Sequence, residues 1–508
     1  MSAPPPPSGE ARQAGFPAAL AGVVAVTLIL RLLLGGAVHL AEDEAYYRLW
    51  SMAPAFGYYD HPPMIAWWIW LGRRLAGGSP LGVRLLPILA TAAASVLIFD
   101  LARLAGADRR TAERAGVWYN ATLLVAAGGF LAVPDAPAAF FWVLTIWCAL
   151  RAANGESISW WLGAGAAAGL AVLSKYSALF LGPGILLWLA LTPGGRRSLR
   201  TPGPWLALAV GGAFVALNLA WNAEHHWLTI AKQFGRVAVA RLAPRYLVEF
   251  VATQVLLLNP LIALFLVRLA GRRRRSEGEG ADPTLFLATS APFLGYLLIH
   301  SLHDRVQAHW PAPVYPALAI CAAMMATRDG RSGPWTALRT AAPIFGLAAC
   351  AAALVVVVAP PIGGFDPALP LRGWPAFARS LDAARVRAGA AWVGTASYGL
   401  DAELADEPGL RAPVVQLAER ERYRDLALGP APDFARPGLM IDLPRRIDIA
   451  ALRACFARVT PLGALVRGGS ANRPGKTYQA LLVSGPRRDV LRDGCAAGGH
   501  GAGVQLHP

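Results

Sequence analysis

The sequence predicts an all-α polytopic membrane protein of about eleven transmembrane helices, followed by a small C-terminal α/β domain. Apolar residues make up 55% of the 508 residues and charged residues only 15%, and the mean hydropathy is +0.43. Soluble domains average about 25% charged residues. Long apolar stretches recur as far as residue 360 and then stop. The chain therefore divides into a membrane part and a water-soluble part.

The net charge of +16 would suggest nucleic-acid binding in a soluble protein. Here most of the excess lies in short loops between apolar stretches, where positive charge sets membrane orientation. We therefore expect membrane lipid as a partner and no nucleic acid. The five cysteines form no CxxC or Cys/His cluster, which argues against a metal scaffold or a redox motif.

The membrane part begins after a Pro-rich, polar stretch, 1–15, which we expect to be disordered and cytoplasmic. The apolar stretch that follows is longer than a signal-peptide core, so we interpret it as a retained first span. Several of the later segments fall short of the ~20 residues of a usual crossing. The expected spans of the transmembrane domain, 16–360, are 16–38, 81–105, 113–131, 136–152, 160–174, 176–193, 203–223, 246–269, 284–302, 310–327 and 340–360.

Arginines gather in alternate loops, which the positive-inside rule assigns to the cytoplasm. They are Arg109, Arg110, Arg114, Arg151, Arg196, Arg197, Arg200, the four at 272–275, Arg328, Arg331 and Arg339. The other loops and the C-terminal domain, 361–508, then face the opposite side. Abundant Ala, Gly, Pro and Arg with three lysines indicates a GC-rich bacterial genome. The expected location is the bacterial inner membrane, with these outer loops in the periplasm.

The C-terminal domain alternates strand-like runs with polar turns and short helical patterns. The runs are 391–395, 414–417, 439–442 and 479–483. Cys455 and Cys495 both fall in this domain. In an oxidising compartment they could form a disulfide, and two unpaired core cysteines are the alternative.

The first outer loop, 39–80, carries three consecutive acids, Glu42, Asp43 and Glu44. Repulsion between neighbouring carboxylates raises the pKa of one of them, which suits proton transfer. The alternative is a solvated helix cap beside a belt of interfacial tryptophans. That alternative explains the aromatic run 67–70 well and the acids less well.

Asp135 lies between two prolines in a very short outer loop. On local grounds such a residue is most often a helix N-cap.

Lys175 lies inside the apolar run 160–192. An ammonium at membrane depth costs roughly 2.5–3.5 kcal/mol on insertion scales, so we expect an anionic partner, such as a phosphate at the membrane surface. The alternative is a turn between two short helices, from which the side chain reaches a lipid headgroup.

Several further cations lie on the outer side, against the positive-inside bias. A site for an anionic headgroup or phosphate would explain them. They are Lys232, Arg236, Arg241, Arg245 and Arg305.

Six motifs occur in order along the chain: Asp-Glu-Ala-Tyr-Tyr (43–47), Tyr-Asp-His-Pro-Pro-Met (59–64), Gly-Val-Arg-Leu-Leu-Pro (82–87), Pro-Asp-Ala-Pro (134–137), Leu-Ser-Lys-Tyr-Ser (173–177) and His-Trp-Pro-Ala-Pro (309–313). This series resembles bacterial members of the protein-mannosyltransferase-like GT-C glycosyltransferases, among them the aminoarabinose transferase of lipid A and the rhizobial lipopolysaccharide galacturonosyltransferases. The resemblance covers roughly 16–325 and, more loosely, the C-terminal domain, where 397–404 is also similar.

The resemblance implies a GT-C fold and a polyprenyl-phosphate sugar donor used on the periplasmic side. Asp43 would be the catalytic carboxylate that deprotonates the acceptor hydroxyl, and in-line attack would invert the anomeric centre. Asp135 matches the second acid of the family and would be the second catalytic residue. His61 matches the His-Pro-Pro motif of protein mannosyltransferases and would contact the donor phosphate or a metal. The aminoarabinose transferase has a motif similar to Lys-Pro at this position.

The remaining candidates are expected to bind substrate. Preorganised cations would stabilise the departing phosphate. The candidates are Lys175, Arg305 and His309, followed by Arg236 and Arg245. The full set is Glu44, Tyr58, Tyr59, Asp60, His61, Lys175, Arg236, Arg245, Arg305 and His309. No cofactor is required by the sequence; a divalent metal is an open alternative, with Asp43, His61 or Asp135 as candidate ligands.

The expected function is transfer of a sugar to a glycolipid such as lipid A or the lipopolysaccharide core, by a monomer. A protein Ser/Thr acceptor is the alternative within the same reaction class. A lipid-linked-sugar flippase is the main competitor from another class, but no internal repeat typical of transporters is visible. An assembly protein with a membrane anchor would need far fewer spans.

Overall fold

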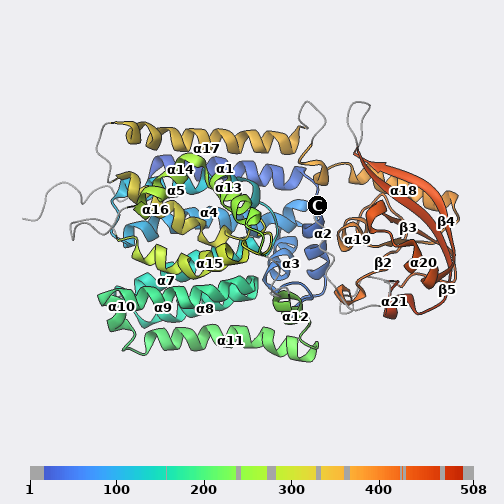
Figure 1. The fold of residues 1–508 in the computed structure, drawn as a ribbon, viewed down its shortest axis with the longest axis horizontal. Coiled ribbons are helices and arrows are strands. Elements are labelled where there is room, and N and C mark those ends of the chain that lie inside the picture. The colour runs from blue at the N-terminus through green and yellow to red at the C-terminus, as the bar shows by residue number, and fades with distance from the viewer. Residues whose placement is uncertain are drawn as a thin grey trace, which may run out of the picture.

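A helical bundle and a smaller sheet domain lie end to end (Figure 1). The computed structural model describes residues 16–155, 157–235, 242–271, 282–327, 333–359, 366–423, 426, 431–468 and 475–495. The expected order, a helical membrane part followed by a small domain with a sheet, is confirmed. The N-terminal stretch 1–15 and Arg236 and Arg241 lie outside the described residues.

Within the described part of the chain, five helices are long and apolar enough to cross a membrane. They are α1 (Ala18–Ala37), α4 (Pro80–Leu104), α7 (Asp135–Ala153), α11 (Gly203–Glu224) and α17 (Pro334–Val358). The pair α13 (Arg245–Leu258) and α14 (Pro260–Gly271) would make a sixth crossing, bent by 112°.

The other apolar segments form shorter helices, and each of the eleven predicted segments contains at least one helix. These are α5 (Arg109–Asn120), α6 (Leu123–Gly128), α8 (Ile158–Ser174), the 3-10 turn η1 (Tyr176–Phe180), α9 (Leu181–Leu191), α15 (Thr284–His300), the turn η3 (Ala312–Val314) and α16 (Tyr315–Thr327). How many of them cross the bilayer stays a prediction.

Two predicted spans are broken, and the breaks contact each other. Segment 113–131 is interrupted at Ala121, after which Thr122 caps α6. Segment 246–269 is interrupted at Asn259, which has a φ of 81° and precedes Pro260. Asn tolerates positive φ and Pro cannot continue the hydrogen-bonding ladder. The side-chain amide of Asn259 donates to Ala342 O of α17 at 2.8 Å. A neighbouring helix therefore supplies a hydrogen-bond partner at the break.

Small residues let α8 and α11 approach closely. A Cβ on Gly165 would collide with the Ala207 carbonyl, and a Cβ on Gly169 would lie 2.7 Å from the Phe214 Cβ. Glycines four residues apart are a common device for close packing of membrane helices.

The C-terminal domain contains a five-stranded mixed sheet in the order β2-β1-β3-β5-β4. Strands β1 (Trp392–Thr395), β2 (Val414–Gln416) and β3 (Gly438–Asp442) are parallel, and β5 (Lys476–Pro486) runs antiparallel to both β3 and β4 (Phe456–Arg467). The helices of the domain are α18 (Trp374–Arg387), α19 (Tyr398–Leu404), α20 (Ile449–Cys455) and α21 (Val490–Asp493).

The four predicted strand-like runs lie in β1, β2, β3 and β5, but β4 was not predicted. It is an edge strand with mostly exposed side chains. Pro461 and Gly463 flank a register shift within it. Proline and glycine in sheets are largely confined to edges and bulges. The sequence of this strand therefore lacks the alternation of apolar and polar residues that predicts a strand.

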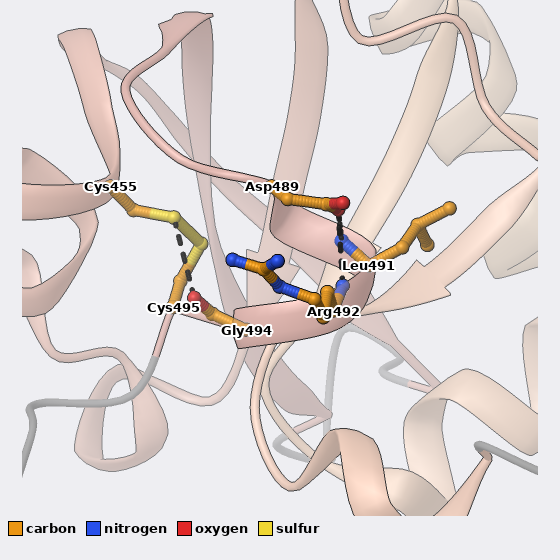
Figure 2. The surroundings of a disulfide bond; sticks show 6 residues. All are labelled: Cys455, Asp489, Leu491, Arg492, Gly494 and Cys495. Carbon is orange, nitrogen blue, oxygen red and sulfur yellow. Dashed lines mark hydrogen bonds between the residues drawn. A yellow bond between two sulfur atoms is a disulfide. The ribbon is translucent and has the colours of Figure 1, made fainter.

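Cys455 and Cys495 form a disulfide, which decides between the two alternatives for this pair. Their Cα atoms are 5.4 Å apart. Figure 2 shows that the bond lies beside the short α21 turn, whose N-terminus is capped by Asp489 through the Leu491 and Arg492 amides, both at 3.1 Å. The disulfide therefore ties the last described turn to the start of β4.

We predict that Gly165→Val destabilises the α8–α11 pair, because overpacking a close contact costs about 1–3 kcal/mol. Thermal unfolding in detergent should show a lower midpoint for this variant. Gly212→Val is the matched control, since a Cβ on Gly212 meets nothing within 4 Å. Equal midpoints for the two variants would contradict the packing argument.

Candidate functional site

Helix α2 (Glu42–Trp50) in the first loop, 39–80, is fixed by a buried ion pair. The Glu44 carboxylate accepts from Arg84 Nε at 2.8 Å and from Arg84 Nη2 at 2.5 Å, and both side chains are fully buried. Glu44 also accepts from the amides of Ala41 and Ala132, each at 2.9 Å. All these donors are protein groups. The burial of Glu44 argues against the predicted contact with a substrate.

Asp43, on the same helix, is exposed, and it accepts a hydrogen bond from the Tyr398 hydroxyl of α19 at 2.9 Å. Partial loss of solvent raises the pKa of the Asp43 carboxyl, and the charges of Glu42 and Asp60 raise it further. The Tyr398 hydrogen bond and the Arg422 charge oppose that rise. Solvent still reaches this carboxyl, so screening reduces the size of the shift in pKa.

Asp135 is the first residue of α7, and its side chain is used for pairing instead of capping. Its Oδ1 lies 2.7 Å from Lys175 Nζ, and its Oδ2 lies 3.7 Å from His309 Nε2. Lys175 is extended at the C-terminal end of α8 and its ammonium lies 5.8 Å from the Trp310 ring centroid. The break between helices at Lys175 agrees with the alternative interpretation. The anionic partner was also expected, but in the structure it is a carboxylate.

The first loop and the Asp135 cluster are neighbours. Ala132, three residues before Asp135, bonds to Glu44, the residue after Asp43. His61 acts electrostatically on Asp135, and its ring lies 6.2 Å from that of Tyr47 in α2. The structure therefore brings five predicted residues together at one end of the bundle: Asp43, His61, Asp135, Lys175 and His309. In Figure 1, α2 and α3 (Met64–Ala76) lie between the bundle and the sheet domain.

The predicted tyrosines of the first loop differ in exposure. Tyr58 is buried, stacks on Trp50 with ring centroids 4.5 Å apart, and donates its hydroxyl to the backbone. It therefore has a structural role. Tyr59 is half-buried under Lys232, whose Nζ lies 5.2 Å from the ring centroid.

Asp60 forms an ion pair with Arg422 of the C-terminal domain. It also accepts from the Tyr46 hydroxyl at 3.1 Å. The Asp60 carboxylate, which was predicted to bind substrate, is therefore bound to these protein groups in the structure.

The remaining predicted cations have protein partners or lie outside the described residues. Arg305 pairs with Glu249 at 2.5 Å, and Arg245 stacks on Tyr246. The structure does not join either of them to Asp135. Arg236 is among the residues that are not described.

The candidate metal ligands do not form a recognisable centre. Within the described residues, Asp43, His61 and Asp135 are not part of any group of three or more His, Cys, Asp or Glu side chains that could hold a metal ion. These three side chains therefore do not by themselves form a divalent-metal centre.

Sequence reasoning missed Tyr398 and Arg422, which the C-terminal domain contributes. Arg422 lies over the Tyr398 ring at 4.4 Å and over the Tyr59 ring at 5.2 Å. The similarity of segment 397–404 to the glycosyltransferases was the available signal for Tyr398. Nothing near Arg422 in the sequence distinguishes it from the other arginines.

Comparison with known proteins confirms the resemblance predicted from the motifs. Residues 60–221 match the model of the dolichyl-phosphate-mannose-protein mannosyltransferase family. A lipid A galacturonosyltransferase of Rhizobium johnstonii is 28% identical over 288 residues, which are 55% of this chain and 59% of that protein. An undecaprenyl phosphate-alpha-4-amino-4-deoxy-L-arabinose arabinosyl transferase of Pseudomonas aeruginosa is 31% identical over 164 residues, 29% of this chain and 28% of that protein. The matches thus span less than two thirds of either relative.

The fold is similar to that of a solved crystal structure. The crystal structure of ArnT from Cupriavidus metallidurans bound to undecaprenyl phosphate matches 91% of this chain and 97% of its own, with a TM-score of 0.62 and 15% identity. This match covers both the helical bundle and the C-terminal domain, and it identifies the architecture as a GT-C fold.

We predict that Glu44→Gln lowers the free energy of unfolding by about 3 kcal/mol, because breaking a buried ion pair leaves Arg84 uncompensated. Chemical or thermal unfolding of the purified protein measures this change. Glu42→Gln is the control, since Glu42 is partly exposed and pairs with Lys476 at 3.4 Å. A stable Glu44→Gln protein that loses substrate affinity would restore the original prediction of a binding role.

Proposed function

We propose that this chain, a multi-pass membrane protein related to the GT-C glycosyltransferases, transfers a sugar from a polyprenyl-phosphate donor to a periplasmic glycolipid such as lipid A. The observation that carries the proposal is the meeting of Asp43, His61, Asp135, Lys175 and His309 at one end of the bundle. The names of the two curated relatives, one a lipid A galacturonosyltransferase, support the substrate class.

Asp43 acts as the general base in this proposal. Its exposed carboxylate accepts the proton of the acceptor hydroxyl while that oxygen attacks the anomeric carbon. The bond from the anomeric carbon to the phosphate oxygen breaks on the opposite face, so the anomeric centre is inverted. The raised pKa of Asp43 strengthens it as a proton acceptor.

The cluster around Asp135 receives the departing phosphate. Lys175 and His309 supply hydrogen-bond donors, and fixed cations stabilise charge that develops in the transition state. Asp135 holds both donors within 4 Å before the phosphate arrives. Its carboxylate thereby positions both side chains and compensates the charge of Lys175 when no sugar donor is bound.

The reaction centre lies on the periplasmic side of the inner membrane in this proposal. Two observations support this side. The C-terminal domain next to the centre contains a disulfide, which is typical of oxidising compartments. Helix α10 (Pro193–Ser198), which carries Arg196 and Arg197, lies at the opposite end of the bundle (Figure 1), as the positive-inside rule predicts for cytoplasmic loops.

A secreted protein is the second candidate acceptor, because the matching family model describes protein mannosyltransferases. The two acceptors share the donor and the inverting chemistry. Envelope lipids that gain one sugar support the glycolipid, whereas a modified Ser or Thr in a secreted protein supports the alternative.

We predict that Asp43→Asn abolishes sugar transfer, with a fall of about 10²–10⁴-fold expected for loss of a general base. The test is complementation of a host that lacks the gene, read as the mass of envelope lipids. Wild-type protein should restore one added sugar and Asp43→Asn should not.

Glu42→Gln is the matched control for this experiment. It removes the neighbouring carboxylate, which pairs with Lys476, and should still restore the sugar. Full restoration by Asp43→Asn would exclude Asp43 as the base and favour transport or binding.

We also predict an acid limb in the pH profile of kcat/KM that lies above the ordinary aspartate pKa of 3.8. Asp43 must be ionised to accept a proton, and its pKa is raised. Activity should therefore fall as the pH drops through that raised pKa. Initial rates from about pH 4 to about pH 8 measure the limb, and a flat profile down to pH 4 would contradict the assignment.

A further inference from the structure

The C-terminal domain contacts the reaction centre as well as covering the end of the bundle. The Tyr398 hydroxyl donates to Asp43 Oδ1 at 2.9 Å, across 355 positions of sequence. Among the described residues no second donor bonds to Asp43, so Oδ2 is left for an acceptor hydroxyl. The Tyr398 ring packs against the Tyr46 ring with centroids 4.9 Å apart, which restricts the direction of its hydroxyl.

The start of α19 is held close to α2. A Cβ on Gly399 would lie 2.7 Å from Glu42 Oε2 and 3.0 Å from Glu42 Cβ. Only a residue without a side chain allows this approach unchanged. The neighbouring Tyr398 therefore reaches Asp43 from a backbone that is already in contact with α2.

Arg422 supports the same contact from a second segment of the domain. Its guanidinium pairs with Asp60 and, at 2.6 Å, with Glu419, and it covers the Tyr398 ring at 4.4 Å. A guanidinium over an aromatic face is attracted by the ring quadrupole. Arg422 thus neutralises the carboxylate next to His61 and fixes the ring whose hydroxyl holds Asp43.

Further polar contacts dock the domain on the first loop, so these two residues do not act alone. They are His39 with Glu407 at 3.1 Å, Arg48 with Asp406 at 3.2 Å, and Lys476 with Glu42 at 3.4 Å. Ala402 and Tyr423 also belong to the apolar cluster around Tyr46 and Trp50.

We propose that Tyr398 and Arg422 are positioning residues for sugar transfer, which hold Asp43 in the reactive arrangement, so that the C-terminal domain completes the reaction centre. This inference rests on the proposed function. Neither residue touches the reacting atoms: Tyr398 acts through Asp43, and Arg422 acts through Tyr398.

The test is steady-state kinetics of the purified full chain with a synthetic polyprenyl-phosphate sugar and lipid A. Tyr398→Phe should lower kcat about ten- to a hundred-fold, the size expected for one hydrogen bond to a charged group, while KM for the donor changes little. Tyr398→Phe should cause no further loss of the residual transfer rate that Asp43→Asn leaves. Tyr478→Phe is the matched control, because this hydroxyl bonds to Arg467 within the same domain, and it should retain wild-type kcat.

Arg422 provides a second readout if Tyr398→Phe fails to fold. Arg422→Lys keeps the charge opposite Asp60 and should retain more of kcat than Arg422→Leu. Equal kcat for wild-type, Tyr398→Phe and Arg422→Leu, with Asp43→Asn inactive, would overturn the inference and leave the proposed function intact. Absence of transfer by the wild-type chain would instead overturn the proposed function itself.

Discussion

The buried ion pair between Glu44 and Arg84 is the constraint on which the arrangement of the site depends. Arg84, on α4, also donates to the carbonyls of Gly35, Val38 and His39 at the end of α1. Glu44 in turn accepts from the amide of Ala132. One pair of side chains thus joins α1, α2, α4 and the loop that leads to Asp135. Such a pair is strongly destabilising to break, although replacing both partners by apolar residues can be neutral.

This constraint separates two neighbouring acids by role. Glu44 faces the interior and is saturated by protein donors, so Asp43, one position earlier on the helix, faces outward and keeps an oxygen without a protein donor among the described residues. The loop that follows Ala132 then brings Asp135 to the same end of the bundle. There it pairs with Lys175 from the break after α8 and with His309 from the loop before α16. Residues far apart in sequence are therefore held together by the Ala132–Glu44 hydrogen bond and by the Asp135–Lys175 ion pair, which has little exposure to water. The His309 side chain that faces Asp135 is half exposed.

Much of the fold could be predicted because hydropathy and turn chemistry are local properties. The helical segments and four of the five strands follow from them, whereas β4 does not, because an exposed edge strand with Pro461 and Gly463 lacks an apolar pattern. The site was predictable where motifs that occur in a fixed order along the chain include its residues, as at Asp43, Asp135 and Lys175. The roles within a motif were not, because only packing distinguishes the buried Glu44 and Tyr58 from the exposed Asp43. Arg422 pairs with a residue 362 positions away, and no local pattern predicts a contact of that kind.

The most direct measurement for this account is transfer by the purified chain in proteoliposomes that contain a polyprenyl-phosphate sugar and lipid A. Mass spectrometry would follow both lipids. If the chain transfers sugar as proposed, lipid A gains one sugar while an equal amount of free polyprenyl phosphate appears, with inversion at the anomeric carbon. An intact donor that only changes leaflet, with unmodified lipid A and unmodified protein acceptors, would contradict the account and identify the chain as a lipid transporter.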